Sequence, residues 1–391
     1  MLQFNGFEFA ATPTLYVGWG VVERQLATQL RQFKARRIML VTGRHVAERA
    51  CRYLAPLNGV HHVIVQGEPT VALIDKLVTN APQDIDLVVG IGGGSVLDAA
   101  KAIAGLLPER YSVLDYLEGV GCGRTLQQPP VAFIAVPTTA GTGSETTKNA
   151  VISEPGQFKK SFRDARLLAK QAWLDPSWLV DCPKQVLYPT AMDALTQLIE
   201  SYVTLKANPM TDALAWQGMV LFQGALAALD GDDEAQKQQA FANLMLAASL
   251  SGITLANAGL GAVHGLAGPI GAFFDAPHGV VCARLLAPIT RENIQALRAQ
   301  SGQEAVLRKY GAIARLLRAE PTESACADDA ESLIDELERL TQRYVPQGLA
   351  AYGLTAQNVA PVIGHCRAGS MLGNPLVLPD EALLRALIAA L

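Results

Sequence analysis

Residues 86–101, DLVVGIGGGSVLDAAK, constrain the fold more than any other part of the chain. An apolar run passes through Gly90, Gly92, Gly93 and Gly94 into a helical pattern, which indicates a strand, a tight turn and a helix. Glycines let a backbone approach a ligand closely, and the free N–H groups at a helix start attract phosphate. We therefore expect a dinucleotide-type site here, with Ser95 capping the helix. A tight turn without a ligand is the alternative, since the spacing differs from the G-x-G-x-x-G fingerprint.

The same alternation of strand and helix patterns runs through the first half of the chain. Apolar runs at 37–43, 61–67, 86–95 and 131–139 are separated by helical patterns that reach about residue 56, cover about 70–80 and follow the glycines. This order predicts βαβ units and a mostly parallel sheet. From about residue 184 strand signals stop, and helical patterns occupy 189–204, 211–229, 238–258, 304–319 and 328–345. The last of these helices should bury Leu333, Ile334, Leu337, Leu340 and Tyr344.

The change of pattern predicts two domains, because 391 residues are too many for one ordinary core. Pro176, Pro183 and Pro189 should interrupt any element that continues across the boundary. We expect an α/β N-terminal dinucleotide-binding domain with a mostly parallel sheet over residues 1–183. An all-helical C-terminal domain should follow over residues 184–391.

Composition favours a folded enzyme with a small-molecule partner. Half of the residues are hydrophobic, 17% are charged and the net charge is −4, which argues against nucleic acid and anionic membrane surfaces. The six cysteines include no C-x-x-C pair and are expected to be reduced thiols with no assigned chemistry. With no secretory signal in the first residues, a cytoplasmic location is expected.

One uncharged stretch, from Gln238 to Phe274, is long enough to cross a bilayer as a helix. It contains serine, threonine, asparagine and several glycine residues and lacks a basic flank and a second span. We therefore interpret it as a helix buried in a large protein and not as a membrane segment.

A second polar loop, VPTTAGTGSETTKN at 136–149, follows another apolar run. Its hydroxyl groups and backbone donors suit pyrophosphate or ribose, although a plain polar loop is the alternative. Two such loops after two strands favour a nucleotide site, since open α/β sheets bind ligands beyond the carboxyl ends of their strands. Asp98 and Lys101 lie early in the glycine-loop helix, from which they should reach the ligand cleft. The hydroxyl residues of the second loop are Thr138, Thr139, Thr142 and Ser144.

A metal site is the main candidate in the second half. Asp193 and Gln197 are four residues apart and share one face of a helix, while His264 and His278 lie in an otherwise apolar segment. Such oxygen and imidazole donors suit zinc, Fe(II) or another divalent first-row metal. Gln197 is the weakest donor, and without it a position would stay open for water or substrate. The alternative, that each side chain is satisfied by backbone partners, stays open at this point.

Six ordered segments resemble the iron-containing (group III) alcohol dehydrogenase family. They are GGGSVLDAAK, PTTAGTGSE, DALTQLIESYV, NPMTDALA, NAGLGAVHGLAGPIG and PHG, and the resemblance spans nearly the whole chain. It implies a dehydroquinate synthase-like fold and metal-dependent hydride transfer between NAD or NADP and an alcohol, aldehyde or ketone in a cleft. It also implies a homo-oligomer, often a dimer.

Carried over by position, the resemblance implies site residues of three kinds. Asp193, His264 and His278 become metal ligands, and Gln197 stands where the family has a histidine. Gly268 stands where many members carry another histidine, and Gly268-Pro269 is expected to end a helix so that the two imidazoles converge. His264, His278 and Asp98 are the expected catalytic residues, Asp98 or bound water serving as proton relay. The implied cofactor residues are Gly92, Gly93, Gly94, Ser95, Thr138 and Thr139, with Asp98, Asn149 and Lys160 nearby.

Cofactor preference is predicted from the end of the first strand. Members that prefer NAD often have an aspartate where this chain has Gly43, and a carboxylate there would repel a 2′-phosphate. Gly43 followed by Arg44 therefore predicts that NADP is tolerated or preferred.

Three other activities stay open at this stage. Glycerol dehydrogenases resemble a site with one aspartate and two histidines, and maleylacetate reductases resemble the fold without a clear need for a metal. A non-redox enzyme similar to dehydroquinate synthases would also pair a nicotinamide with a metal. A binding or sensor protein with a retired site is the remaining alternative, favoured by Gln197 and Gly268.

Overall fold

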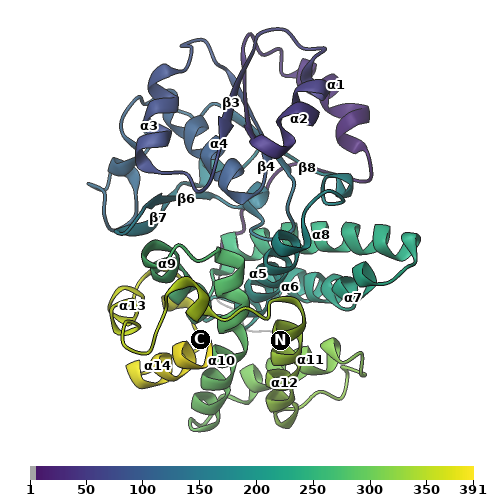
Figure 1. The fold of residues 1–391 in the computed structure, drawn as a ribbon, viewed down its shortest axis with the longest axis vertical. Helices are drawn as coiled ribbons and strands as arrows, with labels where there is room; N and C mark the ends of the chain where they lie inside the picture. Colours follow the sequence, from purple (N-terminus) through teal and green to yellow (C-terminus); the bar gives the residue numbers. More distant parts are fainter. Residues whose placement is uncertain (1–5) are drawn as a thin grey trace. The chain divides into compact units, whose positions relative to one another are not determined.

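A computed structural model describes residues 6–391, which divide into two compact units. One is an α/β unit, Ala10–Cys182, and the other is a helical unit, Pro183–Leu391, to which residues 6–9 also belong. Figure 1 labels their helices and strands.

The α/β unit is built on a six-stranded sheet in the order β1-β8-β5-β4-β2-β3, and every neighbouring pair of strands is parallel. This confirms the prediction of an N-terminal α/β region with a mostly parallel sheet. The strands are β1 Leu15–Val17, β2 Ile38–Gly43, β3 Val60–Val65, β4 Leu87–Gly92, β5 Ala132–Pro137 and β8 Gln171–Leu174.

Helices cover both faces of this sheet, with α3 and α4 on one side and α1 and α2 on the other (Figure 1). Successive strand residues point to opposite faces, so Val88 packs in one apolar cluster, while Leu87 and Val89 pack in the other. A strand buried on both faces must be apolar throughout, as the sequence of β4 is. The helices are α1 Ala27–Gln32, α2 Ala47–Leu54, α3 Val71–Asn80 and α4 Gly94–Leu106.

A separate antiparallel hairpin, β6 Asn149–Glu154 with β7 Phe158–Arg163, follows the second polar loop. It was not predicted, because the charged sequence of β7 lacks the apolar run that marked the other strands. Its tight turn uses Gly156 at φ +76°, a conformation that favours glycine.

The second unit is helical throughout its described elements, as predicted. Its helices are α5 Lys184–Val203, α6 Pro209–Phe222, α7 Ala225–Asp230, α8 Glu234–Ala258, α9 Ala262–Phe273, α10 His278–Arg298, α11 Glu304–Leu317, α12 Ser332–Tyr344, α13 Ala360–His365 and α14 Asp380–Ala389. The pattern at 211–229 is two helices, since Gly224 adopts a left-handed conformation between them. The five apolar residues predicted for the inner face of the helix near 328–345 are all buried.

Two expectations about proline in this unit are wrong. Pro189 lies inside α5, and α9 continues through Pro269 as far as Phe273. A proline removes one helical hydrogen bond, yet both helices continue through their prolines. The chain reverses instead after α9, where Asp275 has φ +48°.

Helix α8 satisfies length and composition criteria for a membrane span, and 67% of its most apolar window is buried inside the structure. It packs against α5, α6 and α7 of the same unit. This packing supports the interpretation of a buried helix.

Candidate active site

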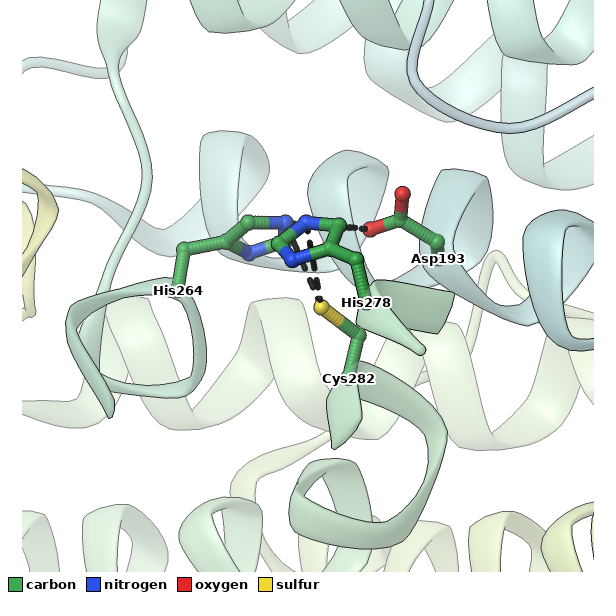
Figure 2. A group of neighbouring side chains, drawn as sticks. All are labelled: Asp193, His264, His278 and Cys282. Atoms are coloured by element: carbon green, nitrogen blue, oxygen red, sulfur yellow. Dashed lines mark hydrogen bonds and ion pairs between the residues drawn. The ribbon is translucent and has the colours of Figure 1, made fainter. Parts of the chain in front are cut away.

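Four side chains from three helices of the helical unit meet at one point (Figure 2). Asp193 comes from α5, His264 from α9, and both His278 and Cys282 from α10. One ligand atom from each residue lies within 4.8 Å of the others, which is the arrangement that a metal ion requires. Asp193, His264 and His278 were predicted from the sequence to form a metal site, and the structure shows that their side chains converge.

The distances between the donor atoms are those of a compact cluster. Asp193 Oδ1 lies 3.1 Å from His264 Nε2 and 3.7 Å from His278 Nε2. The Cys282 Sγ lies 3.6 Å from each of the same two nitrogens. The side chains of Asp193 and His264 are 1% and 7% exposed, whereas that of His278 is 28% exposed. The cluster is therefore most accessible beside His278.

Close packing of α10 on α5 positions these groups. His278 is the first residue of α10, and a side chain on the next residue, Gly279, would place its Cβ 2.5 Å from the carbonyl oxygen of Pro189. A glycine is therefore needed for this contact, which holds the start of α10 beside the helix that carries Asp193.

The electrostatics of the cluster suit a cation. Burial alone would raise the pKa of Asp193, but the imidazoles of His278 and His264 lower it to about 2, so the carboxylate is ionised. Burial would lower the pKa of His264, yet its neighbours Cys282, Asp193 and Glu200 raise it well above its usual value. The cluster therefore favours positive charge at the place that a cation would take.

Glu200 orients the His264 ring by binding the nitrogen that faces away from the cluster. Its two carboxylate oxygens lie 2.6 Å from His264 Nδ1 and 2.7 Å from the backbone nitrogen of Val263. A carboxylate accepts hydrogen bonds only, so Nδ1 carries a proton and Nε2 is the nitrogen that is left to bind a metal. Glu200 was not predicted from the sequence, although it lies two helical turns after Asp193 on the same face of α5.

The positions of Gln197 and Cys282 in the structure differ from those expected from the sequence. Gln197 is buried, and its Oε1 accepts a hydrogen bond from Ser251 Oγ at 3.0 Å. Cys282, to which the sequence analysis assigned no chemistry, lies among the donors. The missed signal was the spacing of four residues after His278, which places both side chains on one helix face.

The glycine loop of the α/β unit runs from β4 into α4. The helix begins at Gly94, and no side chain caps its first turn within residues 6–391, so the expected Ser95 cap is wrong. Ser95 follows the first helical residue, too late in the chain to cap it. The uncapped amide groups suit an anion such as a phosphate.

The two predicted loops pack directly on each other. A Cβ at Gly94 would lie 2.6 Å from Thr142 Oγ1, and one at Gly93 would lie 3.2 Å from Thr139 Cγ2. The amide of Thr138 also donates to the carbonyl of Gly92 at 3.0 Å. Side chains on these glycines would therefore push the loops apart.

Asp98 and Lys101 hold the second loop from inside. Asp98 accepts hydrogen bonds from Ser144 Oγ at 2.5 Å and from the Val151 amide at 3.0 Å. Lys101 is fully buried and donates to the Ser144 carbonyl and to Thr147 Oγ1, each at 2.7 Å. The expectation that Lys101 reaches a ligand is wrong, because these loop acceptors surround its ammonium group. Both oxygens of Asp98 are likewise engaged, and its catalytic role stays a prediction.

The remaining predicted cofactor residues differ in their surroundings. Asn149 Oδ1 is buried without a hydrogen-bond partner among the described residues, as expected for an atom that binds a ligand. Lys160 lies on β7, opposite Ile152 of β6. Gly43 ends β2, and the exposed Arg44 guanidinium lies beside the Gln66 amide.

A parallel sheet with a glycine loop, together with a cluster of carboxylate and imidazole donors, defines a metal-dependent enzyme that uses a dinucleotide. Residues 12–176 match the family model described as iron-containing alcohol dehydrogenase, and residues 188–390 match the C-terminal model of the same family. The chain belongs to the iron-containing alcohol dehydrogenase family. It is an NAD-linked, metal-dependent oxidoreductase of alcohols and aldehydes.

Individual relatives agree with this assignment. The chain is 36% identical to a long-chain-alcohol dehydrogenase 1 of Geobacillus thermodenitrificans (strain NG80-2) over 70% of each sequence. It is 30% identical to an NAD-dependent methanol dehydrogenase of Bacillus methanolicus over 90% of this chain and 91% of that protein. A crystal structure of a 1,3-propanediol oxidoreductase superposes with a TM-score of 0.85 at 25% identity, covering 98% of this chain and 99% of that one. The resemblance and the fold class are thereby confirmed.

Proposed function

We propose that this chain interconverts a small neutral alcohol and its aldehyde, with Asp193, His264 and His278 holding the divalent metal. The observation that carries the proposal is the convergence of these three donors from three helices. The named relatives act on methanol, on long-chain alcohols and on 1,3-propanediol, which share a primary alcohol carbon. The apolar sequence of α9 around His264 favours a substrate without charge.

The residues of the chain prepare this site before substrate arrives. Glu200 fixes the tautomer of His264, and α5 holds the ionised Asp193 in a buried position. His278, the most exposed donor, marks the side from which a substrate oxygen approaches. A divalent metal bound here would polarise that oxygen as a Lewis acid. The charge that develops on the oxygen in the transition state would thereby be stabilised by several kcal/mol.

The α/β unit is proposed to bind the dinucleotide. The uncapped start of α4 suits the pyrophosphate, and Gly92, Gly93 and Gly94 allow its close approach. Asn149 Oδ1 supplies an unused acceptor. Ser95, Thr138 and Thr139 are the further proposed contacts, with Asp98 positioning the loop and Lys160 nearby.

NADP is proposed to be tolerated or preferred as the cofactor. Gly43 offers no carboxylate to repel a 2′-phosphate, and the exposed Arg44 follows it. Initial rates with NADPH and NADH under one condition test this proposal, and a clear preference for NADH contradicts it.

The protein is also proposed to act as a cytoplasmic homodimer, as the resemblance described in the sequence analysis implies. Light scattering of the purified chain tests the assembly, and a monomer at working concentration contradicts it.

A panel of short aldehydes with NADPH or NADH, with and without added Zn(II) and Fe(II), tests the proposed function. We expect net oxidation of the reduced cofactor, which a non-redox enzyme or a binding protein would not produce. His264→Ala should lose metal and activity together, while His365→Ala, which changes an exposed histidine of α13, should keep its metal. Full activity in a metal-free His264→Ala protein contradicts the proposal.

A further inference from the structure

Cys282 occupies a ligand position that the metal proposal above leaves unassigned. It lies one helical turn after His278 on α10, is fully buried, and points its sulfur at the two imidazoles (Figure 2). A buried cysteine alone is ordinary packing, but this sulfur lies in a cluster with three other donors.

The spacing of the donors matches a coordination sphere. In a tetrahedral zinc site with Zn–S about 2.3 Å and Zn–N about 2.0–2.1 Å, sulfur and nitrogen ligands lie about 3.6 Å apart. Cys282 Sγ lies 3.6 Å from His264 Nε2 and 3.6 Å from His278 Nε2. Asp193 Oδ1 lies 3.1 and 3.7 Å from the same two nitrogens. One distance is shorter and the other longer than the spacing expected between an oxygen and a nitrogen ligand of tetrahedral zinc.

Charge balance supports a thiolate in this place. Three of the four donors are almost fully buried, and a divalent cation beside them needs anionic ligands to offset the cost of its desolvation. Asp193 supplies one negative charge, and the imidazoles supply none when they bind a metal. A thiolate at Cys282 would supply the second charge, whereas the neutral amide of Gln197 already accepts a hydrogen bond from Ser251.

We propose that Cys282 is the fourth protein ligand of the metal, in place of Gln197, and that the site is selective for zinc. The proposal rests on the proposed function, since it assumes that Asp193, His264 and His278 hold the ion. With four protein ligands in place, a substrate oxygen would enter as a fifth ligand, a coordination number that zinc can adopt during reaction. On binding, the S–H bond breaks, a sulfur–metal bond forms and the proton passes to solvent. A thiolate favours zinc over harder ions such as Mn(II) or Mg(II).

Cobalt substitution reports directly on a sulfur ligand, because a Co(II) thiolate has intense charge-transfer absorption in the near ultraviolet. We expect this band in the Co(II)-loaded wild type and its loss in Cys282→Ser. Two matched controls should keep it: Cys366→Ser, which changes another buried cysteine, and Gln197→Leu, which removes the competing ligand. In a competition between Zn(II) and Mn(II), Cys282→Ser should lose much of the preference for zinc.

X-ray absorption of the zinc-loaded wild type needs no variant and decides the case even where Cys282→Ser fails to fold. One sulfur neighbour at about 2.3 Å is expected. A zinc shell of nitrogen and oxygen only overturns the role of Cys282. If such a protein still binds one metal and reduces aldehydes, the proposed function stands. A wild type that binds no metal overturns both proposals.

Discussion

Replacing Glu200 with glutamine tests how His264 is prepared for a metal. The carboxylate accepts from both His264 Nδ1 and the Val263 amide, at 2.6 and 2.7 Å. A glutamine offers one carbonyl oxygen and one NH₂ group, so one of the two donors must face another donor. If the amide NH₂ faces the imidazole, the ring proton moves to Nε2, where it blocks the metal.

The expected loss follows from the strength of these bonds. A hydrogen bond to a charged group contributes about 1.5–3 kcal/mol, and one between neutral groups about 0.5–1.5 kcal/mol. The difference between the midpoints of these ranges, roughly 1.25 kcal/mol, corresponds to about eightfold in affinity, and the wrong tautomer adds to it. We therefore expect Glu200→Gln to weaken metal binding about 10- to 100-fold, the range known for groups that orient metal-binding histidines.

The assay is competition for zinc between the protein and a chromophoric chelator at fixed pH. The matched control is Glu292→Gln, which neutralises another buried glutamate, bound to Arg385 at 2.5 Å. Equal zinc affinities for wild type, Glu200→Gln and Glu292→Gln would refute the reasoning.

Three further predictions concern the α/β unit. Gly94→Ala should raise KM for the dinucleotide without changing metal content, because its Cβ would lie 2.6 Å from Thr142 Oγ1; steady-state kinetics and metal analysis check this, and an unchanged KM contradicts it. Gly43→Asp should raise KM for NADPH more than for NADH, since its Cβ would meet Val96 at an ordinary 3.5 Å and only the charge is new; equal changes for both cofactors contradict it. Burial lowers the pKa of Lys101 from 10.5 to about 8, so between those values the unfolded chain binds more protons and the free energy of unfolding rises with pH. Denaturant titrations should show wild type gaining stability relative to Lys101→Met from pH 8 to pH 10, and a constant difference would show that the buried ammonium is not penalised.

The sheet was predictable because its signal is local. β4 is buried on both faces, so an unbroken apolar run ending in glycines leaves few alternatives to a central parallel strand. The β6–β7 hairpin lacks that signal, since β7 is half-buried and carries charged residues. The helix boundaries at Pro189 and Pro269 were mispredicted, because each proline lies inside a helix whose continuation the local sequence does not indicate.

The site was predictable only in part, because contacts between residues far apart in the chain leave no local signal in the sequence. Asp193, His264 and His278 were proposed as candidate ligands from their residue types, but spacing alone left their convergence open and only the family resemblance assigned them to one metal. Glu200 and Cys282 were missed because their roles depend on contacts with residues 64 and 18 positions away. Lys101 was misjudged since its burial depends on the second loop, 43 residues further along the chain.

The central claim is that one metal ion is held by Asp193, His264 and His278. Anomalous diffraction from zinc-loaded crystals, recorded on both sides of the zinc absorption edge, tests it most directly. The account predicts a single strong peak per chain with Asp193 Oδ1 and both imidazole Nε2 atoms at about 2.0–2.2 Å. An empty cluster in crystals of an active enzyme, or a peak bound by other residues, would contradict it.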